Sequence, residues 1–317
     1  MNGTTAPSPW LPTAPCTPGR CAAHPDSGTD HAAPAAGAAL AAVRLAAGIG
    51  TVLLGILLAP AAGLLRPPAR LALVRFWVRT VVRAFGVRVR FEGAAVPAAG
   101  PLLVVANHVS WLDIPLLAAV LPGRMVAKAE VRHWPVLGTI AALGGTLFID
   151  RDRLRALPGT VSAMAGVLAG GGRVVVFPEG STWCGRAGGR FRPAAFQAAL
   201  DSGADVQPVR IDYRPTGAAA YVGDDPLGAS LWRIVTTRRL TAEVRTLTPI
   251  SGTRFPDRRS LAAAAQRAVA PQRAVAPQRA VVPQRAVAKD SANLPFSSVH
   301  QRDRSSPASA SSSRTPA

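Results

Sequence analysis

The sequence contains few cysteines, few aromatic residues and almost no lysine. Its three cysteines are Cys16, Cys21 and Cys184, an odd number with two members in a proline-rich leader. This count gives no disulfide framework and fits a reducing compartment best. Cys16, Cys21, His24 and His31 could be read as a zinc set, but their segment lacks core-forming residues. The sequence therefore predicts no metal site and no cofactor.

Acidic residues are also scarce, 17 against 36 basic ones, which gives a net charge of +19. Only Lys128 and Lys289 are lysine, and every other basic residue is arginine. Such a charge would suit nucleic acid or an anionic membrane. Because zinc-finger spacing, a basic-region heptad and an RNA-binding aromatic motif are all missing, nucleic acid is not a predicted partner. The missing GxSxG, GxxxxGK[ST] and GxGxxG patterns argue against α/β serine hydrolases, phosphate-loop proteins and dinucleotide-binding folds.

Composition divides the chain into four parts. Residues 1–35 are rich in Pro, Ala, Gly and Thr and are predicted to form a disordered leader. Residues 36–85 carry apolar and amphipathic helices, and residues 86–257 form a folded domain large enough to bury a core. Residues 258–317 are predicted to be a disordered basic tail. The tail contains four six-residue repeats from Gln266 onward, and a proline at the end of each of the first three prevents a continuous helix.

An uncharged run, Leu45–Leu65, precedes the folded domain. This length suffices to cross a bilayer core, although an interfacial or re-entrant helix and a buried hairpin of a soluble protein are alternatives. The arginines that follow recur every four or five residues among apolar side chains, which is typical of a helix lying on anionic headgroups. They are Arg66, Arg70, Arg75, Arg79 and Arg83. Positive charge on this side predicts attachment to the cytoplasmic membrane with the folded domain on the cytoplasmic face.

Strands alternate with helices in the folded domain. Apolar segments predict strands at 87–93, 101–108, 124–131, 146–151, 173–180, 205–214 and 240–250. Helices are predicted at 114–121, 154–170 and 193–202. This alternation predicts an α/β fold with a mostly parallel central sheet flanked by helices, preceded by the N-terminal helix pair. Ligands of such sheets gather at the carboxyl ends of the strands.

One motif, Asn107–Asp113, directly follows an apolar strand. His108 and Asp113 are five residues apart, so on a continuous helix they would point about 140° apart. If His108 lies in the turn and Asp113 in the first helical turn, the imidazole can fold back onto the carboxylate. Asp113 would then fix the tautomer of a general base. The alternative is helix capping by Ser110 and Asp113, which does not explain a histidine at the strand end.

A second motif, Phe177–Thr182, follows the strand 173–176. Pro178 and Gly180 predict a tight turn that presents Glu179 at the carboxyl end of the strand. A carboxylate at this position can hold a polyol hydroxyl, and exposed backbone N–H groups can hold anionic oxygen. The alternative is an ordinary turn.

A third motif, Gly145–Arg151, ends in an arginine just past an apolar strand. Arg151 could bind phosphate bidentately, whereas the alternative is a salt bridge to Asp150 or Asp152. Lys128 stands out because the chain uses arginine nearly everywhere else. A compact ammonium near a phosphate would explain a lysine there.

Together these motifs resemble the lysophosphatidate (1-acylglycerol-3-phosphate) acyltransferase family. Its signature is Asn-His-x-x-x-x-Asp, Gly-x-x-Phe-x-x-Arg, Phe-Pro-Glu-Gly-Thr-Arg and an apolar Val-x-Pro-Val strand. In this chain the four motifs are NHVSWLD, GTLFIDR, FPEGST and VQPV, in that order. The resemblance covers about residues 75–250.

The resemblance implies an O-acyltransferase of phospholipid biosynthesis, with His108 as general base and Asp113 as its partner. It implies acceptor binding by Lys128, Arg151, Glu179 and Gly180. The expected donor is acyl-CoA or acyl carrier protein. The expected acceptor is a lysophospholipid in the membrane, first of all lysophosphatidate, which would give phosphatidic acid.

The chain departs from the family signature after Glu179-Gly180, where Ser181-Thr182 replaces Thr-Arg. Either a later arginine of the loop replaces the missing one, or the headgroup is less anionic, as in lyso-ornithine lipid. The candidate arginines are Arg186, Arg190 and Arg192. Two further alternatives are an acyl-accepting Cys184 nucleophile and a non-catalytic membrane-binding protein.

Overall fold

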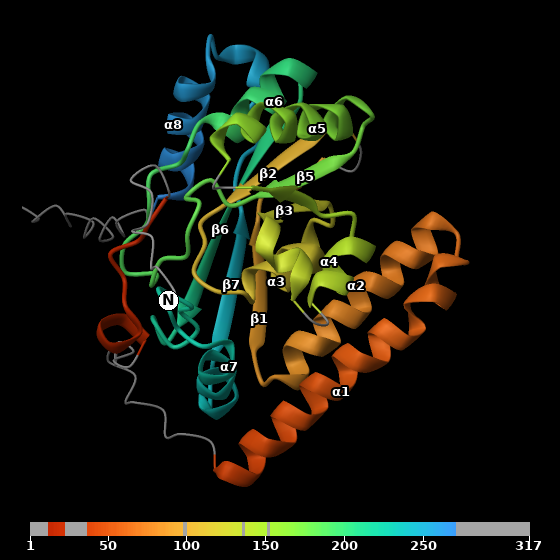
Figure 1. Ribbon diagram of the computed structural model, residues 1–317, viewed down its shortest axis with the longest axis vertical. Helices are drawn as coiled ribbons and strands as arrows, with labels where there is room; N and C mark the ends of the chain where they lie inside the picture. The colour runs from red at the N-terminus through yellow and green to blue at the C-terminus, as the bar shows by residue number, and fades with distance from the viewer. Residues whose placement is uncertain (1–11, 23–36, 98–99, 135–136, 151–152, 271–317) are drawn as a thin grey trace, which may run out of the picture. The chain divides into compact units, whose positions relative to one another are not determined.

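The computed structural model describes residues 12–22, 37–97, 100–134, 137–150 and 153–270. Its centre is a seven-stranded sheet with the order β1-β7-β6-β2-β5-β3-β4 (Figure 1). The strands are β1 (Arg88–Gly93), β2 (Leu102–Ala106), β3 (Arg124–Lys128), β4 (Leu147–Ile149), β5 (Arg173–Val176), β6 (Asp205–Arg214) and β7 (Thr241–Thr246). Every neighbouring pair is parallel except β6 with β7. The predicted mostly parallel α/β fold is confirmed.

Two layers of helices cover the sheet (Figure 1). The helices are α1 (Ala38–Gly63), α2 (Pro67–Ala84), α3 (Asp113–Val120), α4 (Leu137–Leu143), α5 (Leu157–Ala169), α6 (Ala194–Ser202), α7 (Leu227–Thr236) and α8 (Arg258–Val269). Strand β2 is buried along its whole length, and its side chains alternate between two cores. Leu102 and Val104 pack with residues of α2, α3 and α7. Leu103 and Val105 pack with residues of α5, α6 and α8.

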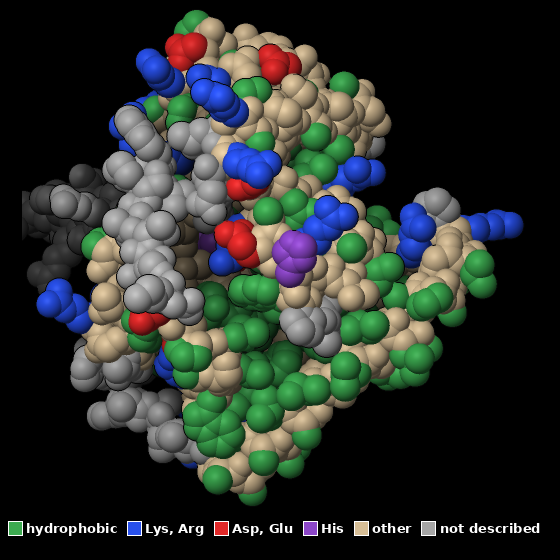
Figure 2. Space-filling model, viewed as in Figure 1, with side chains coloured by type: hydrophobic (Ala, Val, Ile, Leu, Met, Phe, Trp, Pro, Cys, Tyr) green, Lys and Arg blue, Asp and Glu red, His purple; other side chains and the backbone are tan. Residues whose placement is uncertain are grey.

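Helices α1 and α2 form the expected N-terminal pair. Trp77 of α2 lies over Gly55 of α1 and donates from Nε1 to Thr51 O at 2.9 Å. Arg44 ties the first turns of α1 to the end of α7, donating from Nη1 to Val235 O at 2.8 Å. Beyond these contacts the pair presents apolar side chains to the outside, which Figure 2 shows as a green surface over both helices.

Helix α1 is long and apolar enough to cross a membrane, with a mean hydropathy of 2.1 over its most apolar window. This property suggests membrane association. Helix α2 begins with two prolines, which suit a first helical turn, and carries the five expected arginines on or beside it.

The predicted disordered tail is wrong for residues 258–269, which form α8. Asp257 caps this helix, its Oδ1 accepting from Arg259 N at 2.7 Å and from Ser260 N at 3.0 Å. Leu261 and Ala265 are fully buried on the face that packs against α6. The repeat begins inside α8, so its composition conceals an amphipathic helix. Residues 271–317 lie outside the described chain.

The leader prediction also needs correction, because residues 12–22 pack onto the folded domain. They end in a short π-helix, Pro18–Ala22, and both Cys16 and Ala22 are buried. Helices α4 and α7 were not predicted. The strand expected at 124–131 ends at Lys128 and continues as a 3₁₀ turn, Ala129–His133.

Candidate active site

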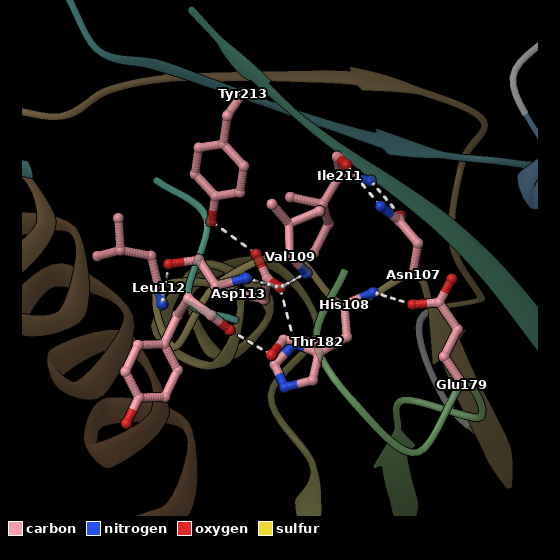
Figure 3. A network of polar contacts seen from close by, with 11 residues as sticks. Asn107, His108, Val109, Leu112, Asp113, Glu179, Thr182, Ile211 and Tyr213 are labelled. Atoms are coloured by element: carbon pink, nitrogen blue, oxygen red, sulfur yellow. Dashed lines mark hydrogen bonds and ion pairs between the residues drawn. The ribbon is translucent and has the colours of Figure 1, made fainter. Parts of the chain in front are cut away.

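His108 and Asp113 lie together beyond the carboxyl end of β2 (Figure 3). His108 is in the turn and Asp113 opens α3, which is the arrangement that brings residues five apart into contact. The His108 Nδ1 atom lies 2.8 Å from Asp113 Oδ2. The ring stacks on Phe177 with centroids 4.0 Å apart, and the side chain is 18% exposed. With Nδ1 donating to the carboxylate, Nε2 carries the lone pair that can accept a proton.

The Asp113 carboxylate is a buried hub of hydrogen bonds. Its Oδ2 also accepts from Val109 N at 2.7 Å and Ser110 N at 2.9 Å, while Oδ1 accepts from Tyr213 Oη at 2.6 Å (Figure 3). Burial and the charge of Asp113 raise the pKa of Tyr213 well above 10, so its hydroxyl stays a donor. Together with His108 Nδ1, four hydrogen-bonding groups thus surround this one buried carboxylate.

The capping alternative is correct in part. Asp113 accepts from Ser110 N, which is one half of a capping box. However, the residue at the N-cap of α3 is Leu112, and its side chain provides no cap. The same carboxylate therefore closes the turn and holds the imidazole, so capping and orientation are compatible.

The backbone of His108 is held on both sides by the loop that follows β5. Glu179 Oε2 accepts from His108 N at 2.8 Å, and Trp183 N donates to His108 O at 2.7 Å. Glu179 Oε1 accepts from Gly189 N at 2.9 Å. Both carboxylate oxygens thus bind backbone N–H groups, and Glu179 positions the histidine turn in addition to facing the pocket.

Glu179 is 5% exposed, and its electrostatics follow from that burial. Burial raises the pKa of this carboxyl from 4.5 to about 7, its two backbone N–H donors oppose the increase, and the charge of Asp113 adds to it. The folded protein therefore binds a proton at Glu179 more tightly than the unfolded chain does.

This raised pKa predicts a pH effect on stability. The stabilisation linked to Glu179 is fully present below pH 4.5 and is lost as the pH rises through about 7, because the folded state holds the proton longer. Glu179→Gln should flatten this part of the curve when the free energy of unfolding is measured by denaturant titration between pH 4.5 and 8. Glu130→Gln, at an exposed position, is the matched control. An unchanged slope in Glu179→Gln would contradict the assignment.

A pocket of about 150 Å³ opens beside His108 and Glu179. This volume is below the roughly 300–1,000 Å³ of pockets for drug-sized ligands, so it suits a headgroup, with acyl chains outside. Among the described residues, its charged lining is Glu179, Arg186, Arg210 and Asp212. Arg190 and Arg192 are exposed and do not line it. The structure thus distinguishes Arg186 from the other two candidate arginines.

Of the three remaining predicted site residues, Gly180 lies in the site, Lys128 lies outside the pocket, and Arg151 is not described. Gly180 has a φ of 76°, and a Cβ there would lie 2.6 Å from Pro12 Cγ, so the turn requires glycine. Lys128 ends β3 at the same sheet edge, but its ammonium lies 5.4 Å from the Trp134 ring centroid, and it does not line the described pocket. Arg151 lies outside the described residues.

Two site residues were not predicted from the sequence. Asn107 holds β6 through both amide atoms, donating to Ile211 O at 2.7 Å and accepting from Ile211 N at 2.8 Å. Tyr213 reaches Asp113 from the same strand. The β2–β6 register, Ala106 opposite Val209, brings these segments together. A lone tyrosine in a strand gives no signal of this partnership.

Comparison with known proteins supports an enzyme. A family model described as Acyltransferase matches residues 88–212. The lyso-ornithine lipid O-acyltransferase of Pseudomonas aeruginosa is 40% identical over 210 residues, covering 64% of this chain and 78% of that protein. The 1-acyl-sn-glycerol-3-phosphate acyltransferase of Neisseria gonorrhoeae is 40% identical over 148 residues, covering 45% and 58%.

A solved structure shares the fold. The 1-acyl-sn-glycerophosphate (LPA) acyltransferase of Thermotoga maritima aligns with a TM-score of 0.58 at 22% identity, over 73% of this chain and 92% of that one. Similarity of fold at this low identity would not show the family. The Pseudomonas aeruginosa relative does, because the chain matches it over more than two thirds of its length. The chain belongs to the acyltransferase family and is a lysophospholipid-type acyltransferase.

Proposed function

We propose that the chain transfers a fatty acyl group from an acyl thioester, carried by CoA or acyl carrier protein, to the hydroxyl of lyso-ornithine lipid. The catalytic observation behind the proposal is the His108–Asp113 contact, in which Asp113 holds Nδ1 and leaves Nε2 for the substrate. His108 removes the acceptor hydroxyl proton, and the oxygen attacks the thioester carbonyl carbon. The tetrahedral intermediate then expels the thiolate, which takes the proton from the imidazolium.

The charge of the pocket supports an amino-acid headgroup. An ornithine acylated on its α-amino group carries one carboxylate and one ammonium. The described pocket is lined by Arg186 and Arg210 together with the carboxyl groups of Glu179 and Asp212, a mixed set that suits a zwitterion. Arg210 is already engaged, since its Nε and Nη2 bind Asp212 at 2.6 and 2.7 Å. A phosphate monoester of about −1.5 to −2 charge would require more cations than this lining offers.

The extent of similarity points in the same direction. The Pseudomonas aeruginosa relative and the lyso-ornithine lipid O-acyltransferase of Brucella abortus are each matched over about four fifths of their length, at 40% and 36% identity. The Neisseria gonorrhoeae relative is matched over 58%. Lysophosphatidate, the acceptor first expected from the motifs, is the second candidate because identity over the shared core is equally high.

The acceptor is tested with purified protein, a labelled acyl thioester and equal concentrations of lyso-ornithine lipid and lysophosphatidate. Wild type should prefer lyso-ornithine lipid. Arg186→Ala should raise the KM for it by roughly tenfold, the effect of losing one charge-assisted hydrogen bond. Arg190→Ala and Arg192→Ala are matched controls, because neither side chain lines the pocket. A wild-type preference for lysophosphatidate would overturn this acceptor while leaving the acyltransferase intact.

We further propose that the folded domain lies on the cytoplasmic face of the membrane. The arginines of α2 directly follow the apolar helix α1, and positive charge is enriched on the cytoplasmic side of membrane segments. Acyl-CoA and acyl carrier protein are soluble donors, and a site on this face gives them access.

A further inference from the structure

All three cysteines of the chain converge at one point outside the catalytic pair. The Sγ atoms of Cys16, Cys21 and Cys184 all lie within 4.8 Å of one another. Cys16 and Cys184 are buried, and Cys21 is half-buried. Cys184 belongs to the loop that follows Glu179, whereas the other two belong to the segment 12–22. More than 160 residues of chain therefore separate the two sources of the cluster.

The segment 12–22 is held against this loop, and against Gly217 after β6, by contacts that do not involve sulfur. Arg186 Nη1 donates to Cys21 O at 3.0 Å. Pro12 covers Gly180, and Cys21 O lies 2.6 Å from the position that a Cβ on Gly217 would take. These close approaches of backbone position the two N-terminal thiols independently of any attraction between the sulfur atoms.

The geometry fits a metal-thiolate centre. Zinc binds thiolates at about 2.3 Å, so sulfur atoms around one tetrahedral ion are about 3.8 Å apart. The three Sγ atoms lie within 4.8 Å of one another, so each sulfur–sulfur distance would have to shorten by about 1 Å or less. Cys16 and Cys21 are separated by four residues, within the ligand spacing of zinc sites. Backbone N–H groups of Arg186 and Ala187 bind Cys184 Sγ, as donors around metal thiolates commonly do.

We propose that Cys16, Cys21 and Cys184 bind a thiophilic d¹⁰ cation, Zn²⁺ or Cu⁺, which fastens segment 12–22 to the loop that follows β5. Soft thiolate sets select these ions. Binding replaces the thiol protons, which are released to solvent as the sulfur–metal bonds form. Since Arg186 binds Cys21 O and also lines the pocket, the fastening holds the arginine that faces the acceptor.

Two other accounts of the cluster make different predictions. If the cysteines served only as small apolar side chains in the core, they would bind no metal and serine variants would lose nothing but packing. If two of them formed a disulfide, the oxidised protein would contain one free thiol and no metal. Mass spectrometry of the thiol-alkylated protein separates these states.

Metal content is the direct test. The full chain is purified in detergent without chelator, and elemental analysis should find one zinc or one copper per chain, which also identifies the ion. Cys16→Ser, Cys21→Ser and Cys184→Ser should each lose it, while Thr17→Ala, an exposed neighbour, should keep it. Cobalt substitution should give sulfur-to-metal charge-transfer absorption in wild type only. Metal-free protein that also fails to bind zinc, cobalt or cuprous ion would overturn the proposal.

Proteolysis tests the fastening without measuring activity. Arg20 is the only Lys or Arg before Arg44, so trypsin releases residues 1–20 only when this segment leaves its seat. With free metal at a hundred times its Kd, cleavage after Arg20 should slow by about a hundredfold relative to chelated protein. Cys184→Ser should be cleaved at the chelated rate with or without metal. Equal cleavage of wild type in both conditions would exclude the fastening, and neither result depends on which lipid is acylated.

Discussion

His108→Ala is expected to reduce the rate of acyl transfer by about 10²–10⁴, the contribution of a general base. The loss should fall on kcat for both acceptors, because the imidazole acts on the hydroxyl proton rather than on the headgroup. The fold should persist, since the side chain is partly exposed and lies in a loop, where it stacks on Phe177. A thioester acyl-transfer assay with circular dichroism and thermal unfolding of each variant checks both statements.

His133→Ala is the matched control for this experiment. His133 is exposed, does not line the pocket and precedes α4. Its variant should keep wild-type turnover. If His108→Ala folded and turned over at a near-normal rate, the proposed base would be wrong, and the acceptor hydroxyl would have to be activated by another group.

Asp113→Asn should give the second large effect, a loss of about 10²–10⁴ in kcat with little change of fold. The amide oxygen can still accept from Val109 N and Ser110 N, and the amide nitrogen can donate to Tyr213 Oη once that hydroxyl rotates. The charge that stabilises the imidazolium is lost, however. If the amide flips, its nitrogen faces Nδ1 and favours the tautomer that blocks proton uptake at Nε2.

Two variants bracket this result. Tyr213→Phe removes one donor but keeps the carboxylate charge, so its loss of kcat should be smaller than that of Asp113→Asn. Asp201→Asn, an exposed carboxylate on α6, should have no effect. Steady-state kinetics with unfolding measurements on the same samples separate a loss of charge from a loss of structure. Wild-type kcat in a folded Asp113→Asn protein would show that the carboxylate serves only to cap the turn.

The mostly parallel character of the sheet and the position of the main motif could be predicted from the sequence for a local reason. Apolar strands followed by tight turns place side chains at carboxyl ends whatever the strand order is, and Asp113 lies only five residues from His108. The contact between them needs one turn and the start of one helix. The number of residues between His108 and Asp113 is therefore enough to predict this contact.

Long-range partners could not be predicted in this way. Tyr213 meets Asp113 across 100 residues, which requires the β2–β6 pairing and its register. The sequence alone groups Cys16 and Cys21 with His24 and His31, whereas in the structure their partner is Cys184, more than 160 residues away. Helix α8 was missed because a repeat with regular prolines dominated the composition, although Leu261 and Ala265 lie four residues apart on one face.

The two backbone bonds that hold His108 have a consequence for water as a competing nucleophile. Glu179 and Trp183 both belong to the loop that forms a wall of the pocket beside His108. Any displacement of this loop would therefore also displace the His108 imidazole. A change that displaced the loop would leave the imidazole unaligned for water as well, so hydrolysis of the thioester is expected to slow together with acyl transfer.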